Sequence, residues 1–189
     1  MSPILGIYAS QISGHLAPPD TGAMFPLGMV QVGSAGVTNI EFTSIPSTYK
    51  HLQLRVFARG TSSATQINFP ITLNNDTASN YRTHILFGNG SSVSSFEFGS
   101  IGGIYLNYMP AANTSASIFG AAVIDILDYT STTKTKVFRY LQGMDSNSSN
   151  GNINFYSGLW TGTTAINRIT FNGDFAQYSS IALYGIKGA

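Results

Sequence analysis

The clearest pattern along the chain is an alternation of apolar and polar side chains in its second quarter. Leu52, Leu54 and Val56 fall on one side of an extended segment, whereas Gln53 and Arg55 fall on the other. A period of two is typical of a β-strand with one buried and one wetter face. This stretch therefore predicts a strand of a sheet, and it contains no obvious catalytic group.

The same pattern predicts strands along the rest of the chain, separated by turns rich in Gly, Asn, Asp and Pro. The expected strands cover residues 27–33, 37–45, 51–59, 66–74, 81–88, 93–98, 104–109, 117–127, 136–143, 153–160, 165–171 and 180–187. Only residues 116–127 could be argued as a helix, and their Ile, Val and Phe content favours a strand. Pro70 removes a donor from its strand, which we expect at an edge or at a bulge.

Many short strands at close spacing, without crossover helices, indicate an antiparallel arrangement. A parallel β-solenoid is the alternative, but no fixed sequence period supports it. We therefore expect an all-β fold, an antiparallel β-sandwich or jelly roll, in a domain that covers residues 27–189.

Residues 1–26 differ from the rest of the chain, because they mix apolar residues with Gly and four prolines and keep neither period. They are also too apolar for a disordered tail. The apolar side chains of interest are those of Ile4, Leu5, Ile7, Ile12 and Leu16. We interpret this irregular N-terminal segment as an arm that docks on a neighbouring subunit; the alternative is a segment that crosses its own domain.

Charge is scarce in this chain. Charged residues make up 9% of the sequence, against roughly 25% in ordinary globular domains, and the formal net charge is +1. Nearly neutral proteins repel one another little and tend to associate. We therefore expect a homo-oligomer, either a trimer or a ring.

Composition also argues against several partners. The nine Lys and Arg residues are scattered, and the densest group, Lys134, Lys136 and Arg139, is typical of a solvated or edge-guarding strand face rather than a phosphate-binding path. No apolar run reaches the length of a membrane span. The absence of cysteine excludes disulfides and thiolate metal sites. We expect neither nucleic-acid binding nor membrane insertion.

Residues that could carry out catalysis do not form a recognisable motif. The three histidines are isolated from one another, without a metal-binding spacing. Asp125 and Asp128 form the closest carboxylate pair, but three steps along a strand place them on opposite faces. We expect Asp125 to bind backbone N–H groups or an arginine, either Arg139 or Arg168. The sequence thus predicts no catalytic residue, no metal and no cofactor.

Aromatic residues are the remaining candidates for ligand binding. Tyrosines and a tryptophan can stack on sugar rings, while Asn and Ser supply hydrogen bonds, and jelly rolls often carry lectin functions. The candidate stacking residues are Tyr108, Tyr156 and Trp160. The alternative, which is the more common case in a sandwich, is that these rings belong to the core.

Several stretches of the chain resemble blocks in minor structural proteins of tailed bacteriophages. They are residues 42–55, the turn at 74–76, the segment I-D-I-L-D-Y-T-S-T-T-K at 124–134, S-G-L-W at 157–160, and residues 175–186. Together they are spread over most of the chain, although residues 1–26 lie outside the resemblance. Each block is a strand or turn pattern, so the resemblance implies a virion component without a catalytic residue.

These observations lead to one expected function and one alternative. We expect a non-enzymatic structural component of a tailed-phage virion, assembled in the host cytoplasm and located in the virion. It would join other virion proteins through its N-terminal arm and decorate the capsid, the collar or fibre, or the tail. The alternative is a carbohydrate-binding module that recognises a glycan of the host cell surface. A hydrolase is the weakest interpretation.

Overall fold

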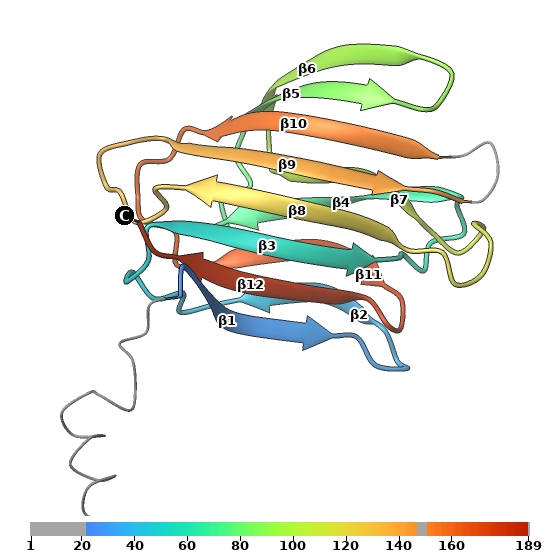
Figure 1. Cartoon of the computed structure of the whole chain (residues 1–189), viewed down its shortest axis with the longest axis horizontal. Coiled ribbons are helices and arrows are strands. Elements are labelled where there is room, and N and C mark those ends of the chain that lie inside the picture. Colours follow the sequence, from blue (N-terminus) through green and yellow to red (C-terminus); the bar gives the residue numbers. More distant parts are fainter. Residues whose placement is uncertain (1–21, 147–150, 189) are drawn as a thin grey trace, which may run out of the picture.

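The computed structural model describes residues 22–146 and 151–188, which form twelve strands and no helix (Figure 1). The strands are β1 (Met24–Gln31), β2 (Val37–Phe42), β3 (His51–Ala58), β4 (Gln66–Leu73), β5 (Tyr81–Gly88), β6 (Val93–Ile101), β7 (Ile104–Pro110), β8 (Gly120–Leu127), β9 (Lys136–Met144), β10 (Asn152–Trp160), β11 (Ile169–Phe175) and β12 (Ser180–Ile186). Each of them overlaps one of the strands predicted from the sequence.

The strands form two antiparallel sheets that pack face to face, so the predicted β-sandwich is confirmed. The larger sheet has the order β1-β12-β3-β8-β9-β10-β5-β6, and the smaller sheet has the order β2-β11-β4-β7. Strands that are distant in sequence therefore lie side by side, as β1 and β12 do along one edge of the larger sheet (Figure 1).

Strand β3 follows the alternation that predicts it. Leu52, Leu54 and Val56 are buried against the smaller sheet, while Gln53 and Arg55 lie on the outer face of the larger sheet. The strand pairs with β12 on one side and with β8 on the other. It therefore lies within the larger sheet, with one face in the core.

The first strand begins at Met24, two residues before the predicted end of the N-terminal arm. Pro26 is tolerated there because β1 is an edge strand and because the register shifts between Pro26 and Gly28. Residues 24–26 thus belong to the first strand of the sheet.

Pro70 lies in β4, which is an inner strand of the smaller sheet and not an edge. Its pairing with β11 ends at Ile71, so no β11 carbonyl needs the N–H group that proline lacks. The pairing with β7 is bulged between Ile67 and Phe69. The prediction of an edge is therefore wrong, and the extra residue of the bulge lies in β7 and not in the strand that contains Pro70.

Aromatic rings fill much of the space between the sheets. The rings of Tyr140 and Tyr156 stack with centroids 4.0 Å apart, and those of Phe69 and Phe175 stack at 4.2 Å. All four side chains are buried. Each pair joins two neighbouring strands of one sheet, and burial of these large rings contributes strongly to the stability of the core.

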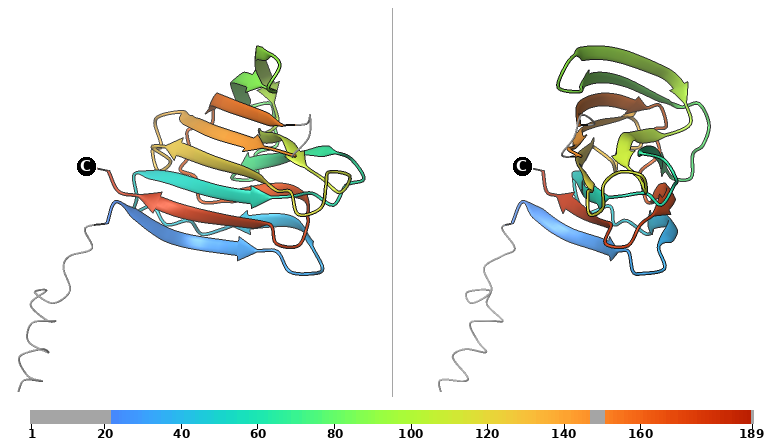
Figure 2. Two further views of the ribbon diagram at one scale, coloured as in Figure 1. Left: turned by 45° about the vertical axis from the view of Figure 1, so that its right-hand side comes forward. Right: turned by 90° about the vertical axis from the view of Figure 1, so that its right-hand side faces the viewer.

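The larger sheet extends beyond the smaller one. Strands β5 and β6 lie at one end of the larger sheet, past the edge strand β7 of the smaller sheet (Figures 1 and 2). The smaller sheet reaches across as far as β8 and β9, against which β7 packs. The outer face of the larger sheet is left uncovered by the described strands, and on the inner side Phe96 and Phe98 of β6 remain exposed.

Candidate functional site

An apolar row crosses the outer face of the larger sheet. Strand register places Val123 of β8 opposite Leu141 of β9, Leu141 opposite Phe155 of β10, and Phe155 opposite Leu86 of β5. These four side chains, which we call the apolar strip, are between 41% and 53% exposed. Scattered single apolar residues are common on protein surfaces, but a contiguous row across four strands is typical of an interaction surface.

The strip arises because several strands are apolar on both faces. In β10, Tyr156 and Trp160 point into the core while Ile153 and Phe155 point outward. Strands of this kind usually belong to sheets that are covered on both sides. This double pattern is visible in the sequence, and it is the signal that could have predicted the strip.

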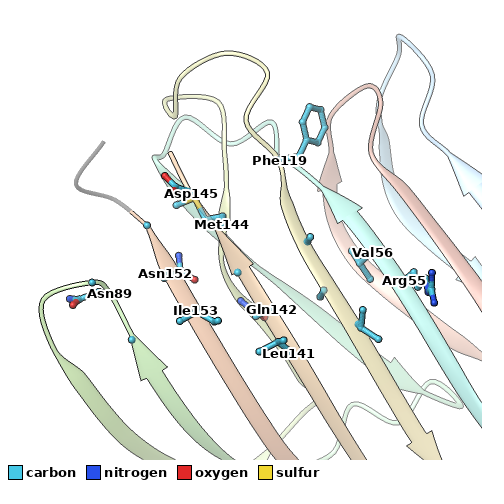
Figure 3. A pocket seen from close by; sticks show the side chains of 17 residues that line it. Arg55, Val56, Asn89, Phe119, Leu141, Gln142, Met144, Asp145, Asn152 and Ile153 are labelled. Atoms are coloured by element: carbon cyan, nitrogen blue, oxygen red, sulfur yellow. The ribbon is translucent and has the colours of Figure 1, made fainter. Parts of the chain in front are cut away.

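A hollow of about 930 Å³ adjoins the strip at one end of β8, β9 and β10 (Figure 3). Its floor is low because Ala121 and Gly143 lie opposite each other across the two strands. A Cβ on Gly143 would come within 2.9 Å of the Asn152 carbonyl oxygen, so a larger residue does not fit. Figure 3 shows Phe119 on one side of the hollow and Ile153 on the other. The hollow shares Val123 and Leu141 with the strip, and polar side chains that include Arg55 and Asp145 also line it.

A polar row runs beside the strip, and it contains several of the titratable groups of this face. It places Asp125, Arg139, Ser157, His84 and Glu97 at successive positions on five adjacent strands. Within the described part of the chain, no hydrogen bond joins Ser157, His84 and Glu97. A serine activated by a histidine would require such bonds. The row therefore borders the apolar strip without forming a nucleophile and base pair.

The predicted partner of Asp125 is wrong. Its carboxylate accepts a hydrogen bond from Gln53 Nε2 at 2.9 Å, whereas Arg139 opposite it forms no ion pair with any described residue. Arg168 instead binds Glu41 with a nitrogen–oxygen distance of 2.6 Å. Gln53 on β3 and Arg139 on β9 both lie opposite Asp125, and of these two side chains the Gln53 amide makes the hydrogen bond.

The other carboxylate of the predicted pair, Asp128, lies in the turn after β8. Its two oxygens bind Lys50 Nζ at 2.9 Å and Lys134 Nζ at 3.0 Å. These hydrogen bonds and the two positive charges lower the pKa of Asp128 to about 2. Asp128 thus stays ionised at neutral pH and connects the start of β3 to the β8–β9 turn.

Lys136 does not lie on a solvated strand face, as was predicted for the basic cluster of Lys134, Lys136 and Arg139. Its side chain is fully buried, and its Nζ donates to the carbonyl oxygens of Ser131, Lys134 and Thr163 at 2.7, 2.9 and 3.0 Å. Burial lowers the pKa of Lys136 below its ordinary value. Lys134 and Arg139 are exposed as predicted, but Lys136 holds two loops together from inside.

Two of the three predicted stacking residues lie in the core. Tyr156 and Trp160 are only 0% and 3% exposed because both occupy inward positions of β10. Burial raises the pKa of Tyr156 to about 12, and the indole Nε1 of Trp160 donates to Asp76 Oδ2 at 2.7 Å. Neither ring has a free face, so their assignment to a glycan site is wrong.

Tyr108 is the predicted stacking residue that reaches the surface, with 40% of its side chain exposed. It lies in a bulge of β7, where Asn107 and Tyr108 together face Asn68 of β4. Its φ of 57° is uncommon for a residue other than glycine and costs on the order of 1–3 kcal/mol. Such bulges redirect side chains. Here the bulge directs Tyr108 toward the inner face of β5 and β6.

The apolar residues predicted to form the docking arm, Ile4, Leu5, Ile7, Ile12 and Leu16, lie outside the described residues. Within the described ranges, no three His, Asp or Glu side chains are grouped so that they could hold a metal ion. The described part also contains no helix that is long and apolar enough to span a membrane.

Comparison with known proteins adds little to this description. No protein-family model matches the chain, and no curated protein matches it. Among solved structures, the marine PL-14 alginate lyase from Aplysia kurodai aligns over 94% of this chain and 92% of its own. The identity is 9% and the TM-score is 0.33. A likeness this distant does not bear on activity.

Proposed function

We propose that this protein is a non-enzymatic structural component of a tailed-phage virion, in which copies pack against one another through the apolar strip. The observation that carries the proposal is the strip itself, an uncharged row across four strands on an uncovered sheet face. The virion setting rests on the sequence blocks that resemble minor structural proteins of tailed phages. The N-terminal arm would attach the protein to other virion proteins.

A second copy of this chain is the occupant that the charge favours. The net charge of +1 leaves little repulsion between copies, so two outer faces can approach each other. The polar row beside the strip places Asp125 and Arg139 next to each other, and such neighbouring opposite charges can set the register between copies.

The free energy gained by burying the apolar strip favours an assembly of many copies over a tight dimer. Full burial of a large apolar side chain contributes roughly 1.5–3 kcal/mol, and about half of that remains for a half-exposed one. The strip and the adjoining Ile153 therefore offer on the order of 4–7 kcal/mol, which is close to the lower cost of association. One such contact is weak, but several such contacts per copy in a ring or lattice together give a stable assembly.

Sedimentation velocity over a range of protein concentrations tests this proposal. Leu141→Asp places a charge in the middle of the strip and should keep the protein monomeric at concentrations where the parent chain associates. Asn39→Asp is the matched control, because it adds the same charge at an exposed position of β2 in the smaller sheet, outside both the strip and the polar row. Equal association of the parent and both variants would contradict the role of the strip.

A further inference from the structure

A second uncovered surface lies between the β5–β6 hairpin and the edge of the smaller sheet. It is a cleft of about 290 Å³, lined on the hairpin side by Phe87, Phe96 and Phe98 and on the β7 side by Tyr105 and Tyr108. We call it the aromatic cleft. Its size is at the small end of ligand pockets, which are about 300–1,000 Å³, and suits a single ring-sized group.

The rings of the cleft remain open because no described strand covers them. Register places Phe96 opposite the buried Ile85, and Phe98 opposite the buried Thr83, so both rings project on the inner side of the sheet. Each of these two phenylalanines is nevertheless 46% exposed, since the smaller sheet ends at β7. The side chains of Phe96 and Phe98 thus point toward the interior of the sandwich, but no strand among the described residues packs over them.

Phe87 connects the two sides of the cleft. Its ring centroid lies 6.3 Å from that of Phe96, in an edge-on arrangement, and 5.3 Å from that of Tyr108. The strained bulge in β7 is what brings Tyr108 into this position. Strained backbone of this kind often occurs at binding sites. The result is an aromatic wall that continues from one sheet to the other.

The polar groups of the cleft are uncharged, and several of them are free. Asn68 Oδ1 accepts from the backbone N–H of Tyr108 at 3.0 Å, which leaves the Asn68 Nδ2 amide without a protein partner in the described part of the chain. The hydroxyls of Tyr105 and Tyr108 also have no hydrogen-bond partner there. Of the residues that the structure describes, no Asp, Glu, Lys, Arg or His lines the cleft.

We propose that the aromatic cleft binds a neutral sugar ring. Aromatic faces carry partial negative charge and suit the C–H face of a sugar, while the free amide and hydroxyls suit its hydroxyl groups. A purely apolar ligand would leave these polar groups unpaired, and an acidic sugar would find no cation to balance its carboxylate. This inference is independent of the proposed assembly role, because the cleft and the apolar strip lie on opposite faces of the larger sheet.

Amide chemical-shift perturbation on the full ¹⁵N-labelled chain tests the proposal. The probes are methyl glucoside, methyl galactoside and N-acetylglucosamine, with glucuronate as the acidic counterpart. We expect at least one neutral sugar to shift the Asn68 side-chain amide and the backbone amides of Tyr108 and Phe96 in a saturable manner. Glucuronate should leave them unchanged.

Matched variants separate the cleft from general surface effects. Phe96→Ala should weaken binding about tenfold, since one stacking ring is lost. Phe57→Ala is the control, because Phe57 is also 46% exposed but lies on the outer face of β3. Tyr108→Phe retains the ring and tests the hydroxyl alone, and it should weaken binding less than Phe96→Ala does.

Three results would overturn the sugar site. One is that none of the neutral sugars shifts these amides. Another is that glucuronate shifts them as strongly as a neutral sugar. The third is that Phe96→Ala and Phe57→Ala change the affinity equally.

Discussion

A single step along β3 separates a core residue from a surface residue. Leu54 is fully buried, so Leu54→Ala should lower the free energy of unfolding by about 2–5 kcal/mol through lost burial and a residual cavity. Gln53 points outward and donates one hydrogen bond to Asp125, so Gln53→Ala should cost only about 1 kcal/mol. Urea denaturation of the two variants measures both values, and equal losses would contradict the assignment of faces.

The ion pairs of Asp128 predict a pH dependence at acid pH. Its pKa is about 2 in the folded protein against 3.8 ordinarily, so the unfolded chain takes up the proton more readily. The stabilising contribution of Asp128 is therefore complete above about pH 4 and is lost as the pH falls toward 2. Asp128→Asn should reduce the decline in the free energy of unfolding across this range.

Urea denaturation at several pH values between 2 and 5 checks this prediction. Asp174→Asn is a suitable control, because Asp174 is an exposed carboxylate that forms no ion pair in the described part of the chain. If Asp128→Asn keeps the slope of the parent protein, the pairs with Lys50 and Lys134 do not lower the pKa in solution.

At the scale of elements, the sequence predicts where strands lie better than how they pair. Turn residues and alternation locate every described strand, because both are local properties of the chain. Sheet order is not local: Gln53 and Asp125, which are hydrogen-bonded, are 72 residues apart. No local pattern indicates that β3 lies between β12 and β8.

The direction of the side chains in β10 could not be predicted for a related reason. Apolar residues occupy both odd and even positions of this strand, so alternation does not tell whether Tyr156 or Phe155 enters the core.

The aromatic cleft could not be predicted from the sequence because it depends on the smaller sheet ending at β7. Tyr108 was predicted as a surface ring, but Phe96 and Phe98 look like core residues in sequence.

The N-terminal arm is the element whose role remains a prediction. Deletion of residues 2–20 should leave the β-sandwich folded, since the first strand begins at Met24. The truncated protein should no longer join its assembly, because burial of several Leu and Ile side chains at roughly 1.5–3 kcal/mol each would be lost. Circular dichroism and incorporation into particles measure the two effects. Normal incorporation of the truncated protein would exclude a docking role for the arm.

At the scale of the whole molecule, we expect no catalysis. Purified protein incubated with host capsule or lipopolysaccharide should release no reducing ends over time, even if the aromatic cleft binds a sugar. The physical reason is that the titratable groups of the outer face, as far as the structure describes them, form no hydrogen-bonded nucleophile and base. Release that scales with protein concentration would contradict this, and His84→Ala would then be the first variant to test.

We expect this chain to be built into a virion with its apolar strip covered. Cryo-electron microscopy of purified particles of a tailed phage that encodes the chain tests this expectation. We predict repeated copies of the sandwich in which Val123, Leu141, Phe155 and Leu86 are buried against neighbouring copies. Particles that lack the chain, or that contain it with the strip facing solvent, would contradict the account.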